Sequence, residues 1–127
     1  MTTRLHSAAI FVTDVARARV FYEDQLGLPV NKEGSFGYEF FQDAPHIGVH
    51  PAQHPEAVAM VGRHTGLTFD VPNLLDFCSR LGEQGVRFVA EPTQQGFGIM
   101  ALVADPDGNI MALWEDNVTE PEATAPE

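Results

Sequence analysis

The sequence predicts an α+β fold made of two βαβββ modules, each with a curved mixed sheet that forms half of a cup. Three observations lead to this prediction. The 127 residues match the size of one compact domain, and 44% of them are hydrophobic, as a packed core requires. The order of strand, helix, glycine and three strands occurs twice, with a repeat of about 59 residues. Ile10–Asp14 in the first copy corresponds to Phe69–Asn73 in the second.

The first module is expected at about residues 3–50. Residues 5–12 are short and rich in apolar and β-branched side chains, which predicts a strand. Asp14 is a suitable N-cap for a helix over residues 14–26, in which apolar residues recur at helical spacing, and Gly27 ends it. Short strands then follow between turn-forming residues, at residues 30–32, 36–41 and 46–50.

The second module is expected at about residues 64–116, after a linker over residues 51–63 with a helical turn at 56–60. A strand at 67–71 precedes a helix at 73–84, which begins at the N-cap residue Asn73 and ends at Gly85. Leu74, Phe77, Cys78 and Leu81 form the apolar stripe of this helix. The three remaining strands are predicted at residues 86–90, 98–104 and 109–115. Residues 1–116 would then form a single domain, followed by a disordered acidic tail over residues 117–127.

The charge balance limits the classes of partner. The chain has seven Lys and Arg residues and 18 Asp and Glu residues, which gives a formal net charge of −11. Such a field repels nucleic acid and anionic membrane surfaces and attracts organic cations, although it also serves solubility. Cys78 is the only cysteine, which excludes an internal disulfide. We expect a cytoplasmic protein, since neither a signal peptide nor a run of about 20 apolar residues is present.

Two motifs are more specific than this pattern. Residues 21–28, with the sequence FYEDQLGL, end the first helix, and residues 105–109, with the sequence DPDGN, form a tight turn. At this spacing, and after a βαβββ repeat, the pair resembles the vicinal oxygen chelate (VOC) superfamily. This group includes glyoxalase I, extradiol dioxygenases, fosfomycin-resistance enzymes and bleomycin-resistance proteins. The resemblance covers about residues 3–116 and implies the glyoxalase/bleomycin-resistance fold.

The resemblance also implies where a metal would bind. Members that use a divalent ion hold it on His, Glu or Gln side chains, and the matching positions here are Ser7, Gly66 and Ala112. Glycine and alanine carry no donor and serine only a weak one, so we expect no metal, no cofactor and no catalytic residue. The alternative is an atypical metal site formed by a subset of His6, His46, His50 and His64.

The alternation of side chains along strands suggests what lines the cup instead. Seven residues are the candidates for ligand binding: Phe11, Tyr38, Phe40, His50, Thr68, Asp70 and Trp114. The sequence does not decide which face Tyr38 and Phe40 share with the others, and Phe11 and Trp114 could equally be core residues. An aromatic surface with an acidic group suits a flat or cationic organic ligand.

These features favour a metal-independent homodimer that binds a small organic molecule and confers antibiotic resistance by sequestration, as bleomycin-resistance proteins do. Two alternatives remain open at this point. One is a lyase, isomerase or dioxygenase with an atypical metal site, and the other is a domain that senses a metabolite for a partner protein.

Overall fold

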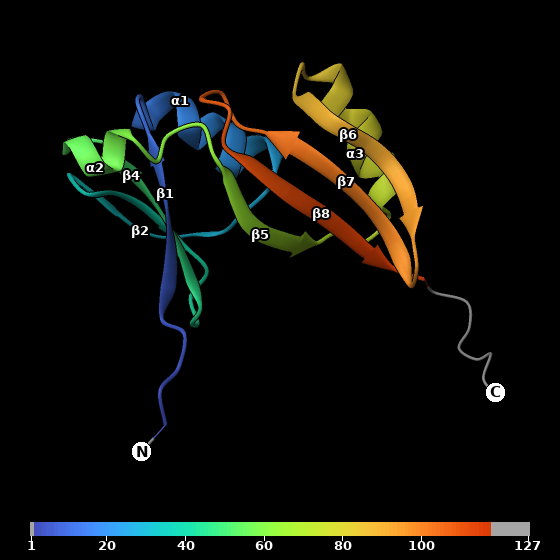
Figure 1. Ribbon diagram of the computed structural model, residues 1–127, viewed down its shortest axis with the longest axis horizontal. Helices are drawn as coiled ribbons and strands as arrows, with labels where there is room; N and C mark the ends of the chain where they lie inside the picture. Colours follow the sequence, from blue (N-terminus) through green and yellow to red (C-terminus); the bar gives the residue numbers. More distant parts are fainter. Residues whose placement is uncertain (1, 118–127) are drawn as a thin grey trace. The chain divides into compact units, whose positions relative to one another are not determined.

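The computed structural model describes residues 2–117 and confirms the α+β fold, with two four-stranded mixed sheets (Figure 1). The chain divides into two compact units. One holds the chain up to Thr65 together with Asp105–Asn109, and the other holds Gly66–Ala104 and the chain from Ile110. The predicted acidic tail lies, apart from Asn117, outside the described residues. Within residues 2–117, no helix combines the length and the apolar character that crossing a membrane demands.

The sheet of the first unit has the strand order β1-β4-β3-β2. β1 runs parallel to β4, and the β4-β3 and β3-β2 pairs are antiparallel. The strands are β1 (Ser7–Val12), β2 (Val30–Gly34), β3 (Gly37–Phe40) and β4 (His46–Pro51). The predicted helical turn in the linker is the short helix α2, Pro55–Val58. Because β1 pairs with β4 in parallel, Phe11 and His50 are register partners and lie on the same face of the sheet.

The first long helix lies where the sequence places it but changes type midway. α1 (Val15–Arg19) is α-helical, and the Asp14 side chain accepts a hydrogen bond from the Arg17 amide, as expected of an N-cap. The next segment, η1 (Val20–Gln25), is a π-helix. The wider turn continues to the Leu26 amide, which donates to the Phe21 carbonyl at 2.8 Å. The prediction of an α-helix over the whole segment is therefore wrong for its second half.

The π-helical segment buries two consecutive aromatic residues. Phe21 and Tyr22 are 2% and 0% exposed, and their rings meet edge to face with centroids 4.8 Å apart. They belong to the core on one face of the first sheet. The sheet residues buried on that face are Ile10, Val12, Phe40, Ile47 and Val49. The opposite face carries Ser7, Ala9 and Phe11, which are exposed or half-buried.

The sheet of the second unit has the order β5-β8-β7-β6. Its strands are β5 (His64–Asp70), β6 (Arg87–Gln95), β7 (Gly98–Ala104) and β8 (Ile110–Asp116). The helix α3 (Leu74–Glu83) packs against this sheet and buries Leu74, Cys78 and Leu81 of the predicted stripe, whereas the fourth member, Phe77, is half-buried. Burial, with a smaller contribution from Glu91, raises the pKa of the Cys78 thiol to about 11, so the thiol is protonated at neutral pH.

The N-terminus of α3 is capped differently from the prediction. Asn73 has a positive φ of 55° and its side chain makes no capping hydrogen bond. Instead, the Glu115 carboxylate accepts hydrogen bonds from the Asn73 and Leu74 amides at 2.9 and 3.0 Å. A carboxylate from β8 thus satisfies two free donors and complements the helix dipole.

The DPDGN turn holds the first unit together. The carboxylate of Asp105 is buried and accepts four hydrogen bonds, from the Tyr22 hydroxyl, the Asn109 side chain and the Asp107 and Asn109 amides. Asn109 also donates to the Phe11 carbonyl and accepts from the Gly62 amide. Burial, the charge of Asp105 and the hydrogen bond to it raise the pKa of Tyr22, so its hydroxyl remains a donor at neutral pH.

Candidate functional site

The open face of the first sheet carries a small aromatic cluster. The rings of Phe11 and His50 have centroids 6.1 Å apart, and the Phe36 and His50 centroids are 6.2 Å apart. Phe36 is 43% exposed although it is a large apolar side chain. Of these three residues, Phe11 and His50 were predicted and Phe36 was not. The strand predicted over residues 36–41 included Phe36, but in the structure this residue lies in the turn between β2 and β3, where strand alternation does not give its orientation.

A hydrogen bond orients the His50 ring. Its Nδ1 lies 2.7 Å from the Phe36 carbonyl oxygen, which can only accept, so Nδ1 carries the proton of this hydrogen bond. The ring lies directly over Gly48, where an added Cβ would fall 2.4 Å from Nε2. Gly48 therefore leaves room for the imidazole on the open face of the sheet.

A second polar group lies on the same face, around Glu39. Glu39 pairs in register with Gly48, and its carboxylate accepts a hydrogen bond from Asn31 at 2.8 Å. His46 approaches the same carboxylate at 3.6 Å and also lies 5.1 Å, ring to ring, from His6. The hydrogen bond from Asn31 lowers the pKa of Glu39, and the charges of His46, Lys32 and His6 add to this effect. The face thus carries a carboxylate that stays ionised beside its aromatic cluster.

Tyr38 and Phe40 lie on the other face of the sheet. Phe40 is 0% exposed and contacts Tyr22, with ring centroids 6.2 Å apart. Tyr38 pairs with the buried Val49, and the guanidinium of Arg19 lies over its ring at 4.6 Å from the centroid. The structure therefore does not bring Tyr38 and Phe40 together with Phe11 and His50.

In the second unit, Trp114 lines a cavity of about 310 Å³. The other lining residues are Asp70, Val71, Pro72, Glu115 and Asp116. The indole Nε1 donates to the Asp116 carboxylate at 2.7 Å, which fixes the ring. Thr68 and Asp70 lie on the same, exposed side of β5. Asp70 lines the cavity, and Thr68 is the next residue on that side of the strand. An aromatic ring beside acidic side chains is the combination that attracts organic cations.

The three positions at which metal-dependent VOC members carry ligands do not fit a metal here. Ser7 is exposed, Ala112 has no donor, and Gly66 has a φ of +78° that disfavours any side chain with donor atoms. Among residues 2–117, no three His, Cys, Asp or Glu side chains come close enough together to hold a metal ion.

Comparison with known proteins identifies the family. The model of the Glyoxalase/Bleomycin resistance protein/Dioxygenase superfamily matches residues 4–113, and the chain belongs to this superfamily. Among curated proteins, it is 31% identical over 119 residues to the uncharacterized protein YurT of Bacillus subtilis (strain 168), covering 83% of this chain and 93% of YurT.

Solved structures agree on the fold. A superfamily member from Sphaerobacter thermophilus DSM 20745 superposes with a TM-score of 0.76 at 22% identity, over 91% of this chain and 98% of that one. TnmS3, an antibiotic binding protein from Streptomyces sp. CB03234, superposes with a TM-score of 0.72 at 23% identity, over the same shares of the two chains. The resemblance noted from the two sequence motifs is thereby confirmed.

Proposed function

We propose that this protein binds a small organic cation or flat aromatic compound on the open faces of its sheets, without a metal or other cofactor. The observation that carries the proposal is Trp114, fixed by Asp116 beside the Asp70 carboxylate in a cavity of about 310 Å³. An aromatic ring beside carboxylates stabilises a bound cation, and the net charge of −11 increases the rate of encounter.

The cluster of Phe11, Phe36 and His50 gives the first unit an aromatic surface of similar character, with Glu39 as its acidic group. Each unit therefore has aromatic side chains and a carboxylate with which a cationic aromatic ligand could interact. Antibiotics are the first ligand class to test, because TnmS3 is described as an antibiotic binding protein and the family resemblance includes bleomycin-resistance proteins. Sequestration of such a compound would confer resistance. We also propose a cytoplasmic location, which suits the single buried thiol of Cys78.

Replacing Trp114 with alanine is expected to weaken binding of a cationic aromatic compound by about two- to thirty-fold, because a cation on an indole face is worth roughly 0.5–2 kcal/mol. Isothermal titration calorimetry measures this loss, with a bleomycin-type glycopeptide as the first compound. Trp114→Phe, which keeps a smaller ring, should recover part of the affinity. Equal affinities for the wild type and Trp114→Ala would contradict the role of the ring.

A homodimer is also proposed, because each sheet ends in edge strands that favour pairing and because the apolar side chain of Phe97, which is 87% exposed, is surface that a second copy would cover. Light scattering during size-exclusion chromatography should give twice the chain mass of 13.9 kDa. A mass equal to one chain at micromolar concentration, unchanged on dilution, would refute the dimer.

Metal independence is a further expected result. Protein purified without chelator should contain clearly substoichiometric zinc, nickel, iron and manganese in elemental analysis. The reason is that Ser7, Gly66 and Ala112 supply at most one weak donor. Ser7→His combined with Ala112→Glu adds two donors and should raise the metal content. One tightly held ion per chain in the unmodified protein would favour the alternative, a lyase, isomerase or dioxygenase that uses His50 with other histidines.

The remaining alternative is a domain that senses a metabolite for a partner protein. Such a domain would use the same binding site as a sequestering protein, and the two differ only in what ligand binding causes. Ligand binding would then change the affinity for a partner protein. Comparing partner capture with and without the bound ligand distinguishes the two.

A further inference from the structure

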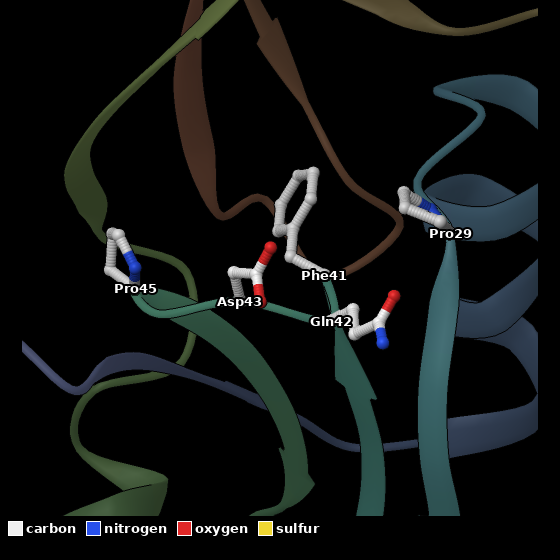
Figure 2. Close-up of a pocket in the computed structure, with 5 residues that line it drawn as sticks. All are labelled: Pro29, Phe41, Gln42, Asp43 and Pro45. Carbon is white, nitrogen blue, oxygen red and sulfur yellow. The ribbon is translucent and has the colours of Figure 1, made fainter.

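A second pocket, in the first unit, has features that the proposed function does not use. It has a volume of about 350 Å³ and is lined by Pro29, Phe41, Gln42, Asp43 and Pro45. These residues belong to the loop between β3 and β4 and to the segment before β2. Figure 2 shows the Phe41 ring projecting from the loop between Pro29 and Asp43, with Pro45 beyond Asp43. The volume lies at the lower end of the range for small-molecule sites.

The backbone of Phe41 holds its ring in this pocket. Phe41 has a φ of 75°, in the left-handed region that favours Gly or Asn and that a bulky residue rarely occupies. Two hydrogen bonds fix it there: the Phe41 amide donates to the Pro29 carbonyl at 2.9 Å, and the His46 ring lies 2.8 Å from the Phe41 carbonyl. The preceding residue, Phe40, is fully buried in the core. The left-handed turn thus separates a core aromatic residue from one that lines the pocket.

The other lining residues define the chemistry of the pocket. The prolines provide two rigid apolar walls, and Gln42 supplies an amide that can donate or accept. Asp43 provides the only charge among the lining residues. Within the part of the chain that the structure describes, its carboxylate has no ion-pair or hydrogen-bond partner. The whole chain, with a net charge of −11, is negative like the Asp43 carboxylate, so both attract a cation. An aromatic ring with an unpaired carboxylate beside apolar walls is complementary to a protonated amine with a compact apolar body.

From these observations we propose that the Phe41–Asp43 pocket is a separate binding site for a small organic monocation, a protonated primary amine on an aromatic or alkyl group. The ammonium group lies between the Phe41 ring and the Asp43 carboxylate, and the apolar body contacts Pro29 and Pro45. This site belongs to the first unit and shares no residue with the Trp114 cavity of the second.

Nuclear magnetic resonance titration of the full chain with benzylamine tests the proposal, with benzyl alcohol as the neutral compound of the same shape. Benzylamine should shift the backbone amide signals of residues 41–44 saturably, and benzyl alcohol should shift them far less. Asp43→Asn should weaken this binding by about two- to five-fold, as loss of an exposed ion pair would. Glu56→Asn, which removes a carboxylate outside both pockets, should leave it unchanged.

The ring is tested by Phe41→Asn, since asparagine tolerates the left-handed backbone while removing the aromatic group. This change should weaken benzylamine binding by about two- to thirty-fold, and Phe41→Tyr should retain it. The Trp114 indole signal separates this proposal from the proposed function. Benzylamine shifts confined to Trp114, equal shifts with benzyl alcohol, or unchanged binding in both Asp43→Asn and Phe41→Asn would overturn the second site. Shifts at residues 41–44 that persist in Trp114→Ala would support it.

Discussion

Asp105→Ala is expected to lower the free energy of unfolding by about 2–4 kcal/mol, because buried donors lose their acceptor and each unsatisfied buried group costs about 1–3 kcal/mol. The Asp105 side chain is 4% exposed and accepts hydrogen bonds from Tyr22, Asn109 and the Asp107 amide. Alanine would leave the buried Tyr22 hydroxyl and Asn109 amide without their acceptor. Urea denaturation followed by circular dichroism measures the loss.

Asp107→Ala is the matched control in the same turn. Asp107 accepts two hydrogen bonds from Thr13, at 2.9 and 2.6 Å, but both are exposed to water. Its replacement should cost about 1 kcal/mol, since water can take the place of the lost acceptor. Equal losses for the two variants would mean that the buried network does not stabilise the first unit as described.

Gly98→Ala is expected to destabilise the protein by about 1–3 kcal/mol and to change the fluorescence of Trp114. A Cβ at Gly98 would fall 2.4 Å from Cζ2 of Trp114 and 2.5 Å from the Glu115 carbonyl oxygen. The indole therefore rests against the β7 backbone because position 98 has no side chain. Thermal unfolding and the emission maximum of the folded protein measure the two effects.

Gly82→Ala provides the opposite case. Gly82 lies in α3, and an added Cβ there would meet no atom within 4 Å. Alanine should stabilise the helix by up to about 1 kcal/mol because it reduces the entropy of the unfolded chain and favours the helix. A loss of stability in Gly82→Ala would contradict the open surroundings of Gly82, and an unchanged stability in Gly98→Ala would contradict the close packing of Trp114 against β7.

Much of the fold was predictable because its signals are local. Asp14 caps its helix as its position predicts, and the strands β4 and β7 lie where the turn-forming residues delimit them. The π-helical segment was not predictable, since its hydrogen bonds depend on burying both Phe21 and Tyr22. The cap of α3 was also missed, because Glu115 lies about 40 residues away in the sequence.

The candidate site was predictable only in part, for the same reason. Strand alternation predicted that Phe11 and Trp114 line the cup, but it could not orient Tyr38 and Phe40 before the register of β3 with β4 was known. The left-handed backbone of Phe41 could not be predicted, because bulky residues rarely adopt it. The hydrogen bonds of its amide and its carbonyl group account for this conformation. Sites that depend on such long-range contacts require the structure.

Fluorescence titration of Trp114 tests the central claim most directly, because it is the only tryptophan in the chain and it lines the proposed site. The titration uses EDTA-treated protein and a panel of cationic and aromatic compounds that includes a bleomycin-type glycopeptide. The account predicts a saturable change for at least one cationic compound, with an association rate that falls as salt is added. A signal and melting temperature unchanged by the whole panel, together with turnover of one substrate after metal is supplied, would contradict it.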